Sequence, residues 1–185
     1  MAGERKLQIL ETLAKMLESP KREKITTASL AAKLDVSEAA LYRHFANKAQ
    51  MFEGLIEFIE ETIFGLINKI SSEETDGAKQ VQRIVTMLLV FAEKNAGMTR
   101  VLIGDALVNE DESLQLRINQ LYDRIEVTLK QSLRISETQT GQKSDVEAKA
   151  NLLVCYVIGR WHQYAKSGFK RKPMEYTQQQ LTAVV

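Results

Sequence analysis

Apolar residues recur every three or four positions through almost all of this 185-residue chain, and that spacing is what most constrains its fold. It places the apolar side chains on one face of an α-helix. The chain has two prolines, Pro20 and Pro173, and both stand where a helical pattern ends. Glycine is sparse, whereas the helix-forming residues Ala, Leu, Glu, Lys and Gln abound. The sequence therefore predicts an all-α fold.

Composition excludes several classes of protein. No apolar run reaches the roughly 18–20 residues of a membrane helix, and the N-terminus lacks the apolar core of a signal peptide. Cys155 is the only cysteine, which suits a reducing cytoplasm. Net charge is +1, but residues 1–50 hold nine Lys/Arg against six Asp/Glu. This basic excess weakly favours a polyanionic partner at the N-terminal end.

Three short helices and a long one are expected in the first 70 residues. Their expected ranges are 4–18, 26–34, 37–44 and 47–70, with Thr26 or Thr27, Ser37 and Asn47 as caps of the last three. A short turn at Asp35 and Val36 separates the second helix from the third. That spacing is typical of a helix-turn-helix, whose second helix enters the major groove of DNA.

The composition of this third helix suits a DNA groove. Small residues near its start let the backbone approach base edges, and its free N–H groups favour phosphate. Leu41 and Phe45 are expected to face the core. The candidate DNA-binding residues are Thr26, Thr27, Ser37, Glu38, Ala39, Ala40, Tyr42, Arg43, His44 and Lys48. The alternative is a generic three-helix module, in which His44 only ends a helix and Tyr42 only covers the core.

The segment TTASLAAKLDVSEAALYRHFANKAQMFEGLIEF, residues 26–58, resembles the N-terminal domain of the TetR-type transcription regulators. The shared pattern is a Thr-capped helix, a Val-Ser turn, Leu-Tyr-Arg-His-Phe, then Lys and a long apolar helix. The resemblance implies a helix-turn-helix domain at residues 1–47 and a larger helical regulatory and dimerisation domain at 48–185. It also implies a homodimer that reads palindromic double-stranded DNA.

Within that family, SEAALYRHF, MFEGLIEFIE, MTRVLIGDAL and RINQLYDRIE resemble members that act in nucleoid occlusion. This closer resemblance implies a protein located on the nucleoid in the cytoplasm. Bound to DNA, it would bind the division GTPase FtsZ and antagonise Z-ring assembly over the chromosome. A ligand-responsive repressor stays open as the alternative, with Phe91, Tyr156, Trp161 and His162 as residues that could line its pocket.

Helices are also expected at about 78–94, 98–107, 111–133 and 146–166, with polar residues 136–144 as a mobile loop. On the first of these, Met87, Val90 and Lys94 form a second face away from the core stripe. Phe58 lies off the core stripe of the preceding helix. We expect these four residues to contribute to the surface for the FtsZ C-terminal tail. In the alternative, Phe58 packs on the first helix and the 78–94 helix is buried all round.

A dimer interface is expected on the last two long helices, because one helix-turn-helix reads too few bases for useful specificity. The candidate interface residues are Leu121, Ile125, Leu129, Leu152, Cys155 and Gly159. Two such helices from each chain would form a four-helix bundle. The alternative is that both stripes are buried within one chain.

No motif for catalysis or for a cofactor is apparent. Cys155 and His162 have no third ligand at metal spacing. There is no Gly-rich phosphate loop. The acidic run at residues 110–112 is interpreted as a solvated helix start. We therefore expect neither an enzyme nor a bound metal or cofactor.

Overall fold

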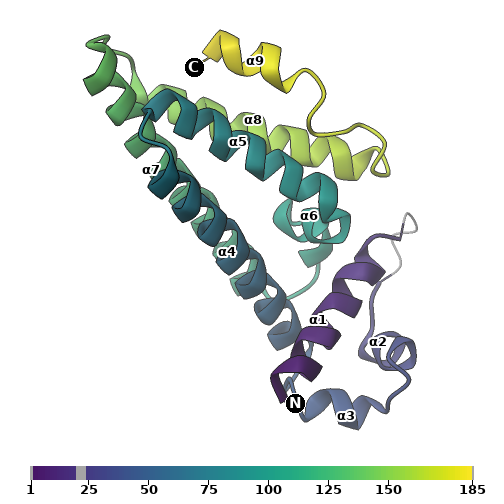
Figure 1. The fold of residues 1–185 in the computed structure, drawn as a ribbon. Coiled ribbons are helices and arrows are strands. Elements are labelled where there is room, and N and C mark those ends of the chain that lie inside the picture. The colour runs from purple at the N-terminus through teal and green to yellow at the C-terminus, as the bar shows by residue number, and fades with distance from the viewer. Residues whose placement is uncertain (1, 20–23, 185) are drawn as a thin grey trace. The chain divides into compact units, whose positions relative to one another are not determined.

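The computed structural model describes residues 2–19 and 24–184. Pro20 and residues 21–23 lie outside these ranges. Within them the chain is all-α, as predicted, and Figure 1 shows the arrangement of the helices. The elements are α1 (Ala2–Leu17), α2 (Thr27–Lys33), α3 (Glu38–Tyr42), α4 (Lys48–Glu73), α5 (Gly77–Lys94), α6 (Ala96–Leu102), the short 3-10 helix η1 (Asp105–Leu107), α7 (Glu112–Thr140), α8 (Val146–Lys166) and α9 (Thr177–Val184).

The described residues pack into two compact units. The first comprises the described residues up to 59 together with 95–118, and the second comprises 60–94 together with 119–184. Helices α4 and α7 each continue from one unit into the other. The first unit is therefore larger than the predicted head at residues 1–47. The boundary at residue 47 stays a prediction about which residues carry DNA binding.

The core of the first unit is built from the helical stripes that the sequence predicts. Leu41 and Phe45 are buried as expected, and α3 packs against α2. Gly54 lets α4 come close to its neighbours, since a methyl group there would lie 3.1 Å from the Phe45 ring. Burial of each large apolar side chain contributes about 2–3 kcal/mol to stability.

Helix α6 packs directly on the end of α1. A methyl group at Gly97 would lie 1.9 Å from the Ala14 carbonyl oxygen, so only glycine allows this approach. Beside it, Arg100 is buried and its Nη1 donates to the Leu17 carbonyl oxygen at 3.1 Å. Its Nε donates to Asp105 at 3.0 Å. The carbonyl group of Leu17, the last residue of α1, is thus held by α6 through a charged hydrogen bond.

In the second unit α5 and α8 lie side by side (Figure 1). Trp161 of α8 is fully buried, and its Nε1 donates to the Leu88 carbonyl oxygen at 3.0 Å. Gly77 brings α5 close to α7, because a methyl group there would lie 2.4 Å from the Ser132 carbonyl oxygen. A buried hydrogen bond of 2.8 Å from Ser132 to Gln80 joins the same two helices.

The prediction that three residues of α7 lie at a dimer interface is wrong. Leu121, Ile125 and Leu129 are only 0–2% exposed in the single chain, so they belong to its own core and have no surface left for a partner. The same three- and four-residue spacing serves either purpose, and here α7 packs inward. By contrast, Leu152, Cys155 and Gly159 of α8 are exposed. No helix among the described residues has both the length and the apolar character to cross a membrane.

Candidate nucleic-acid interface and a groove in the second unit

Side-chain caps fix where α2 begins. The Thr26 hydroxyl accepts from the Ser29 backbone N–H at 3.0 Å, and the Ser29 hydroxyl oxygen accepts from the Thr26 N–H at 3.0 Å. This reciprocal pair satisfies two donors that the first turn of a helix leaves free. Thr26 was predicted as a cap, and its side chain fills that role.

The turn and α3 follow in the predicted order. Asp35 adopts a left-handed conformation with φ of 54°, and the Val36 N–H donates to the Ala31 carbonyl oxygen at 3.0 Å. Ser37 then caps α3 by accepting from the Ala40 N–H at 3.3 Å. Helix α3 ends at Tyr42 rather than near His44, a difference within the usual spread of helix boundaries.

One side of α3 faces solvent and carries most of the predicted DNA-binding residues. Tyr42 is 44% exposed, and Leu41 on the opposite side is buried. Half-buried members of the predicted set are Thr27, Ala40, His44 and Lys48, and exposed members are Thr26, Ser37, Glu38, Ala39, Tyr42 and Arg43. An exposed helix start with small residues, followed by hydroxyl and guanidinium donors, is chemically suited to phosphates and base edges.

Hydrogen bonds bring residues of α2 and α3 together on this surface. The Thr27 hydroxyl donates to Glu38 at 2.6 Å, and the Tyr42 hydroxyl donates to Thr27 at 3.3 Å. The three side chains thus form one connected set across the helix-turn-helix. Thr27 links the two helices, a role that the sequence pattern did not reveal.

Lys48, the first residue of α4, has a partner that sequence reasoning missed. The Asn47 side chain caps α4 by accepting from the Gln50 N–H at 2.9 Å. The Lys48 ammonium forms an ion pair with Glu110, which follows η1. Glu110 had been interpreted as part of a solvated acidic run. Nothing in the local sequence could have identified this pair, because the two residues lie 62 positions apart.

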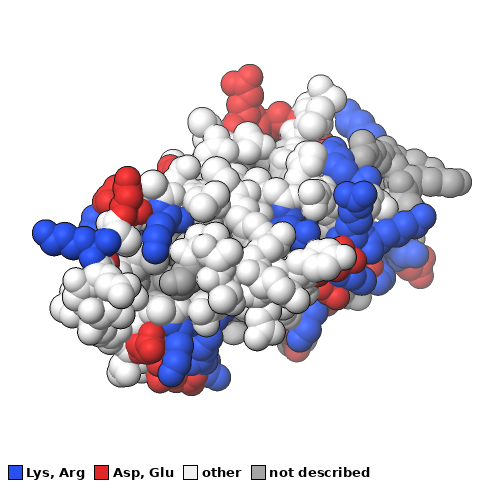
Figure 2. All heavy atoms as spheres, turned by 90° about the horizontal axis from the view of Figure 1, so that it is seen from above, with Lys and Arg blue, Asp and Glu red and all other residues white. Residues whose placement is uncertain are grey.

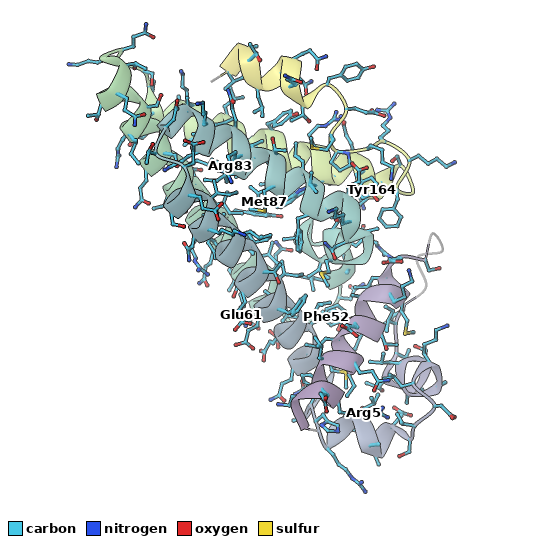
Figure 3. All side chains as sticks on the ribbon, viewed as in Figure 1. Arg5, Phe52, Glu61, Arg83, Met87 and Tyr164 are labelled. Carbon is cyan, nitrogen blue, oxygen red and sulfur yellow. The ribbon has the colours of Figure 1, made fainter. Side chains whose placement is uncertain are left out.

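A groove of about 820 Å³ lies in the second unit between α4, α5 and α9. Met87 and Val90 line it, as does Leu181 of α9. Arg83 also lines it, one turn before Met87 on α5 (Figure 3). Lys94 is exposed at the end of α5, one turn beyond Val90. Phe58, the fourth residue of the predicted surface, belongs to the first unit and does not line this groove.

Helix α9 forms one wall of the groove and is held by α8. The Arg160 guanidinium donates to the carbonyl oxygens of Lys172, Pro173 and Glu175 at 2.8–2.9 Å. The Tyr156 hydroxyl donates to the Gln180 side chain at 2.8 Å. No pattern in the sequence of residues 173–184 indicated this wall.

Three of the four residues proposed to line a ligand pocket have different surroundings in the second unit. Trp161 is buried and bonded to α5, Tyr156 is bonded to α9, and His162 is exposed on α8. Among the described residues, no three His, Cys, Asp or Glu side chains gather closely enough to hold a metal ion.

The surface over α8 and α9 carries few charges. Helix α9 contains no charged residue, and the exposed positions of α8 include Leu152, Cys155 and Gly159. In the view from above, the middle of the surface is largely white, without Lys, Arg, Asp or Glu (Figure 2). Leu152 also borders an apolar cleft of about 290 Å³ between α8 and α9.

Two family models match this chain. Residues 22–55 match the model of the bacterial regulatory proteins of the tetR family. Residues 75–185 match the SlmA-like model of the tetracyclin repressor-like C-terminal domain. The second model alone covers more than half of the chain.

Relatives match over almost the full length. Nucleoid occlusion factor SlmA from Alteromonas mediterranea is 51% identical over 181 residues, which span 97% of this chain and 93% of the relative. The protein of that name from a Marinomonas species is 49% identical over 184 residues, or 98% of this chain and 93% of the relative.

Solved structures share the fold at low sequence identity. The TetR family regulator PfmR from Thermus thermophilus superposes with a TM-score of 0.77 at 21% identity, covering 95% of this chain and 96% of that one. A TetR regulator from Haloarcula marismortui gives 0.80 at 16% identity, covering 98% and 96%. At these identities the similarity supports the fold alone.

Proposed function

The chain belongs to the family of SlmA-type nucleoid occlusion factors, and from that premise we propose which of its surfaces meet DNA, a second copy and the division machinery. It is a DNA-binding nucleoid occlusion factor and not an enzyme. It acts on the nucleoid in the cytoplasm. Bound to palindromic double-stranded DNA, it binds FtsZ and antagonises Z-ring assembly over the chromosome, which coordinates division with chromosome segregation.

DNA meets the exposed side of α3 and the start of α2. The observation that carries this proposal is the connected set of Thr27, Glu38 and Tyr42 on a solvent-facing surface. Helix α3 enters the major groove, Thr26 and Lys48 contact the backbone on either side, and Arg43 and His44 supply further donors.

Selection of bound duplexes from random sequence, followed by fluorescence anisotropy, tests this interface. We expect a palindrome whose half-sites lie about 34–36 Å apart. Tyr42→Ala should weaken binding to it by about tenfold or more. Tyr176→Ala, which removes an exposed tyrosine from the second unit, is the matched control. If the two variants bind the palindrome with equal affinity, Tyr42 does not contact DNA.

The second copy packs on α8 and α9. Leu152 is 52% exposed beside an apolar cleft, and the small side chains at Cys155 and Gly159 allow a partner helix to come close. Leu152→Arg should convert the dimer to a monomer in sedimentation experiments. Val127→Arg places the same charge on an equally exposed position of α7 and should leave the dimer intact. A dimeric Leu152→Arg protein would refute this interface.

The FtsZ C-terminal tail binds in the groove between α4, α5 and α9. The lining is apolar at Met87, Val90 and Leu181 and carries the cations Lys69 and Arg83. Lys94 lies one turn beyond the lining residue Val90, and such an arrangement suits a peptide with an acidic end. Lys69 and Arg83 already pair with Glu73, so an acidic peptide competes with that carboxylate.

Charge reversal on α5 tests this docking. Lys94→Glu should weaken binding of an FtsZ tail peptide by roughly tenfold, since an attraction becomes a repulsion. Lys79→Glu makes the same change at an exposed position in the first turn of α5, at the opposite end of that helix from Lys94, and should have little effect. Equal effects would rule out a contact at Lys94. Release of DNA by a small molecule, with no FtsZ binding, would instead indicate a ligand-responsive repressor.

A further inference from the structure

The ion pair between Lys48 and Glu110 lies within the first unit and is partly shielded from water. The side chain of Lys48 is 22% exposed and that of Glu110 is 13% exposed. Lys48 also lies over the Phe52 ring, 5.6 Å from its centroid. Such a pair is less screened by salt than two fully exposed charges. Lys48 is therefore occupied before any DNA arrives.

The position of Lys48 is one that favours a phosphate. It is the first residue of α4, whose free N–H groups and dipole make that end partially positive. The carboxylate of Glu110 presents to this ammonium the same chemistry that a phosphate oxygen would, a negatively charged oxygen acceptor. The Glu110 carboxylate repels a phosphate that approaches this ammonium, so a close phosphate contact requires the carboxylate to move away from Lys48.

Glu110 is held where it stands by the structure around it. Its N–H donates to the Leu107 carbonyl oxygen at 3.0 Å, and Asn109 before it is left-handed with φ of 66°. At the start of the segment 105–110, Asp105 forms an ion pair with Arg100, and Arg100 also donates to the Leu17 carbonyl oxygen at the end of α1. The carboxylate is thus supplied by an anchored loop and not by a freely moving side chain.

We propose that Glu110 is an intramolecular competitor of the DNA backbone for Lys48. Binding then requires the exchange of this ion pair for a phosphate contact, which rests on the proposed phosphate role of Lys48. The exchange weakens binding to every DNA sequence by the same factor. The result is a shorter residence on random chromosomal DNA, with the ratio of specific to non-specific affinity unchanged.

The test compares Glu110→Gln with Glu112→Gln. Each variant removes one negative charge, and the two positions are two residues apart. Glu112 is exposed at the start of α7. Fluorescence anisotropy is measured with the selected palindrome and with a random duplex of the same length. We expect Glu110→Gln to tighten both affinities by roughly fivefold, the factor expected for loss of one such pair. Glu112→Gln should change them less than about twofold.

A double-mutant cycle with Lys48→Ala separates this inference from the proposed function. In the Lys48→Ala background, Glu110→Gln should have no further effect. If Lys48→Ala binds DNA as well as the wild type, both the phosphate role and the competitor role are refuted. If Lys48→Ala weakens binding but Glu110→Gln does not strengthen it, the competitor role alone fails. Weaker binding by Glu110→Gln would mean that Glu110 positions Lys48 for the phosphate.

The amide introduced by Glu110→Gln still offers Lys48 a hydrogen-bond acceptor, so a second variant is needed. Glu110→Ala removes the acceptor altogether and should bind DNA at least as tightly as Glu110→Gln. Circular dichroism of each variant checks that the helices are intact. Tighter binding is a readout that damage to the fold would not produce.

Discussion

The contact of α6 with α1 gives the sharpest test of the packing, because a single methyl group at Gly97 has no room. That methyl would lie 1.9 Å from the Ala14 carbonyl oxygen and 3.2 Å from Leu17 Cβ. The nearest atom is backbone, so α6 must move away from α1. Overpacking of a well-packed site costs about 1–3 kcal/mol, and the displacement also strains the bond from Arg100 to Leu17.

Gly65 provides a control: the same substitution by alanine is expected to change the stability in the opposite direction. It is exposed in the middle of α4, and nothing lies within 4 Å of the position of an added methyl group. Gly65→Ala should therefore stabilise the protein by about 0.5–1 kcal/mol, because alanine loses less backbone entropy in a helix. Gly97→Ala should instead destabilise it by about 2 kcal/mol or more.

Urea unfolding followed by circular dichroism measures both variants against the wild type. The free energy of unfolding should fall for Gly97→Ala and rise for Gly65→Ala, with similar m-values. A Gly97→Ala protein as stable as the Gly65→Ala protein would refute the close approach of α6 to α1.

Three further variants probe other parts of the structure. Thr26→Ala removes the cap of α2 and should lower the free energy of unfolding by about 1 kcal/mol, as measured by urea titration; an unchanged value would mean that the cap is dispensable. Trp161→Phe removes the buried bond to the Leu88 carbonyl oxygen and replaces the indole with a smaller ring, which should cost about 1–3 kcal/mol in the same assay, so a neutral result would contradict the buried bond. Arg160→Ala removes three bonds to the segment before α9 and should speed hydrogen exchange in residues 172–184, whereas unchanged exchange would show that α9 is held by its apolar contacts alone.

Periodicity was sufficient to predict the helices but not the partner of each apolar face. The inward positions of Leu41 and Phe45 were predicted correctly, because an amphipathic helix has one face to bury. The α7 stripe at Leu121 has the same pattern and was assigned to the dimer. Spacing alone cannot tell a core inside one chain from a core shared by two.

The end of α7 shows how tertiary contacts override local composition. Residues 136–144 are polar and were predicted to form a mobile loop, yet α7 continues to Thr140. Its Gln139 accepts from the Gly77 N–H at 2.9 Å and donates to the Thr75 carbonyl oxygen at 2.7 Å. These bonds cap the start of α5 and hold the last turn of α7 in place. They join residues more than 60 positions apart, which no local pattern reports.

The features of the candidate sites also fall into two groups, those that local sequence predicts and those that depend on contacts between distant segments. The side-chain caps of α2, α3 and α4 could be predicted, because each follows from a short continuous stretch of sequence. The pairing of Lys48 with Glu110 and the α9 wall of the groove could not, since both depend on contacts between distant segments. Met87 and Val90 were correctly paired on one face of α5, but the helix that closes the groove beside them became known only from the structure.

The central claim is that DNA binding and FtsZ binding are coupled in one protein. The most direct test is the affinity of the wild-type protein for a fluorescent FtsZ C-terminal peptide, measured by anisotropy with and without the selected palindrome. We expect the palindrome to raise the affinity for the peptide, and by reciprocity the peptide to raise the affinity for DNA. Equal peptide affinities with and without DNA, or no binding in either condition, would contradict the claim.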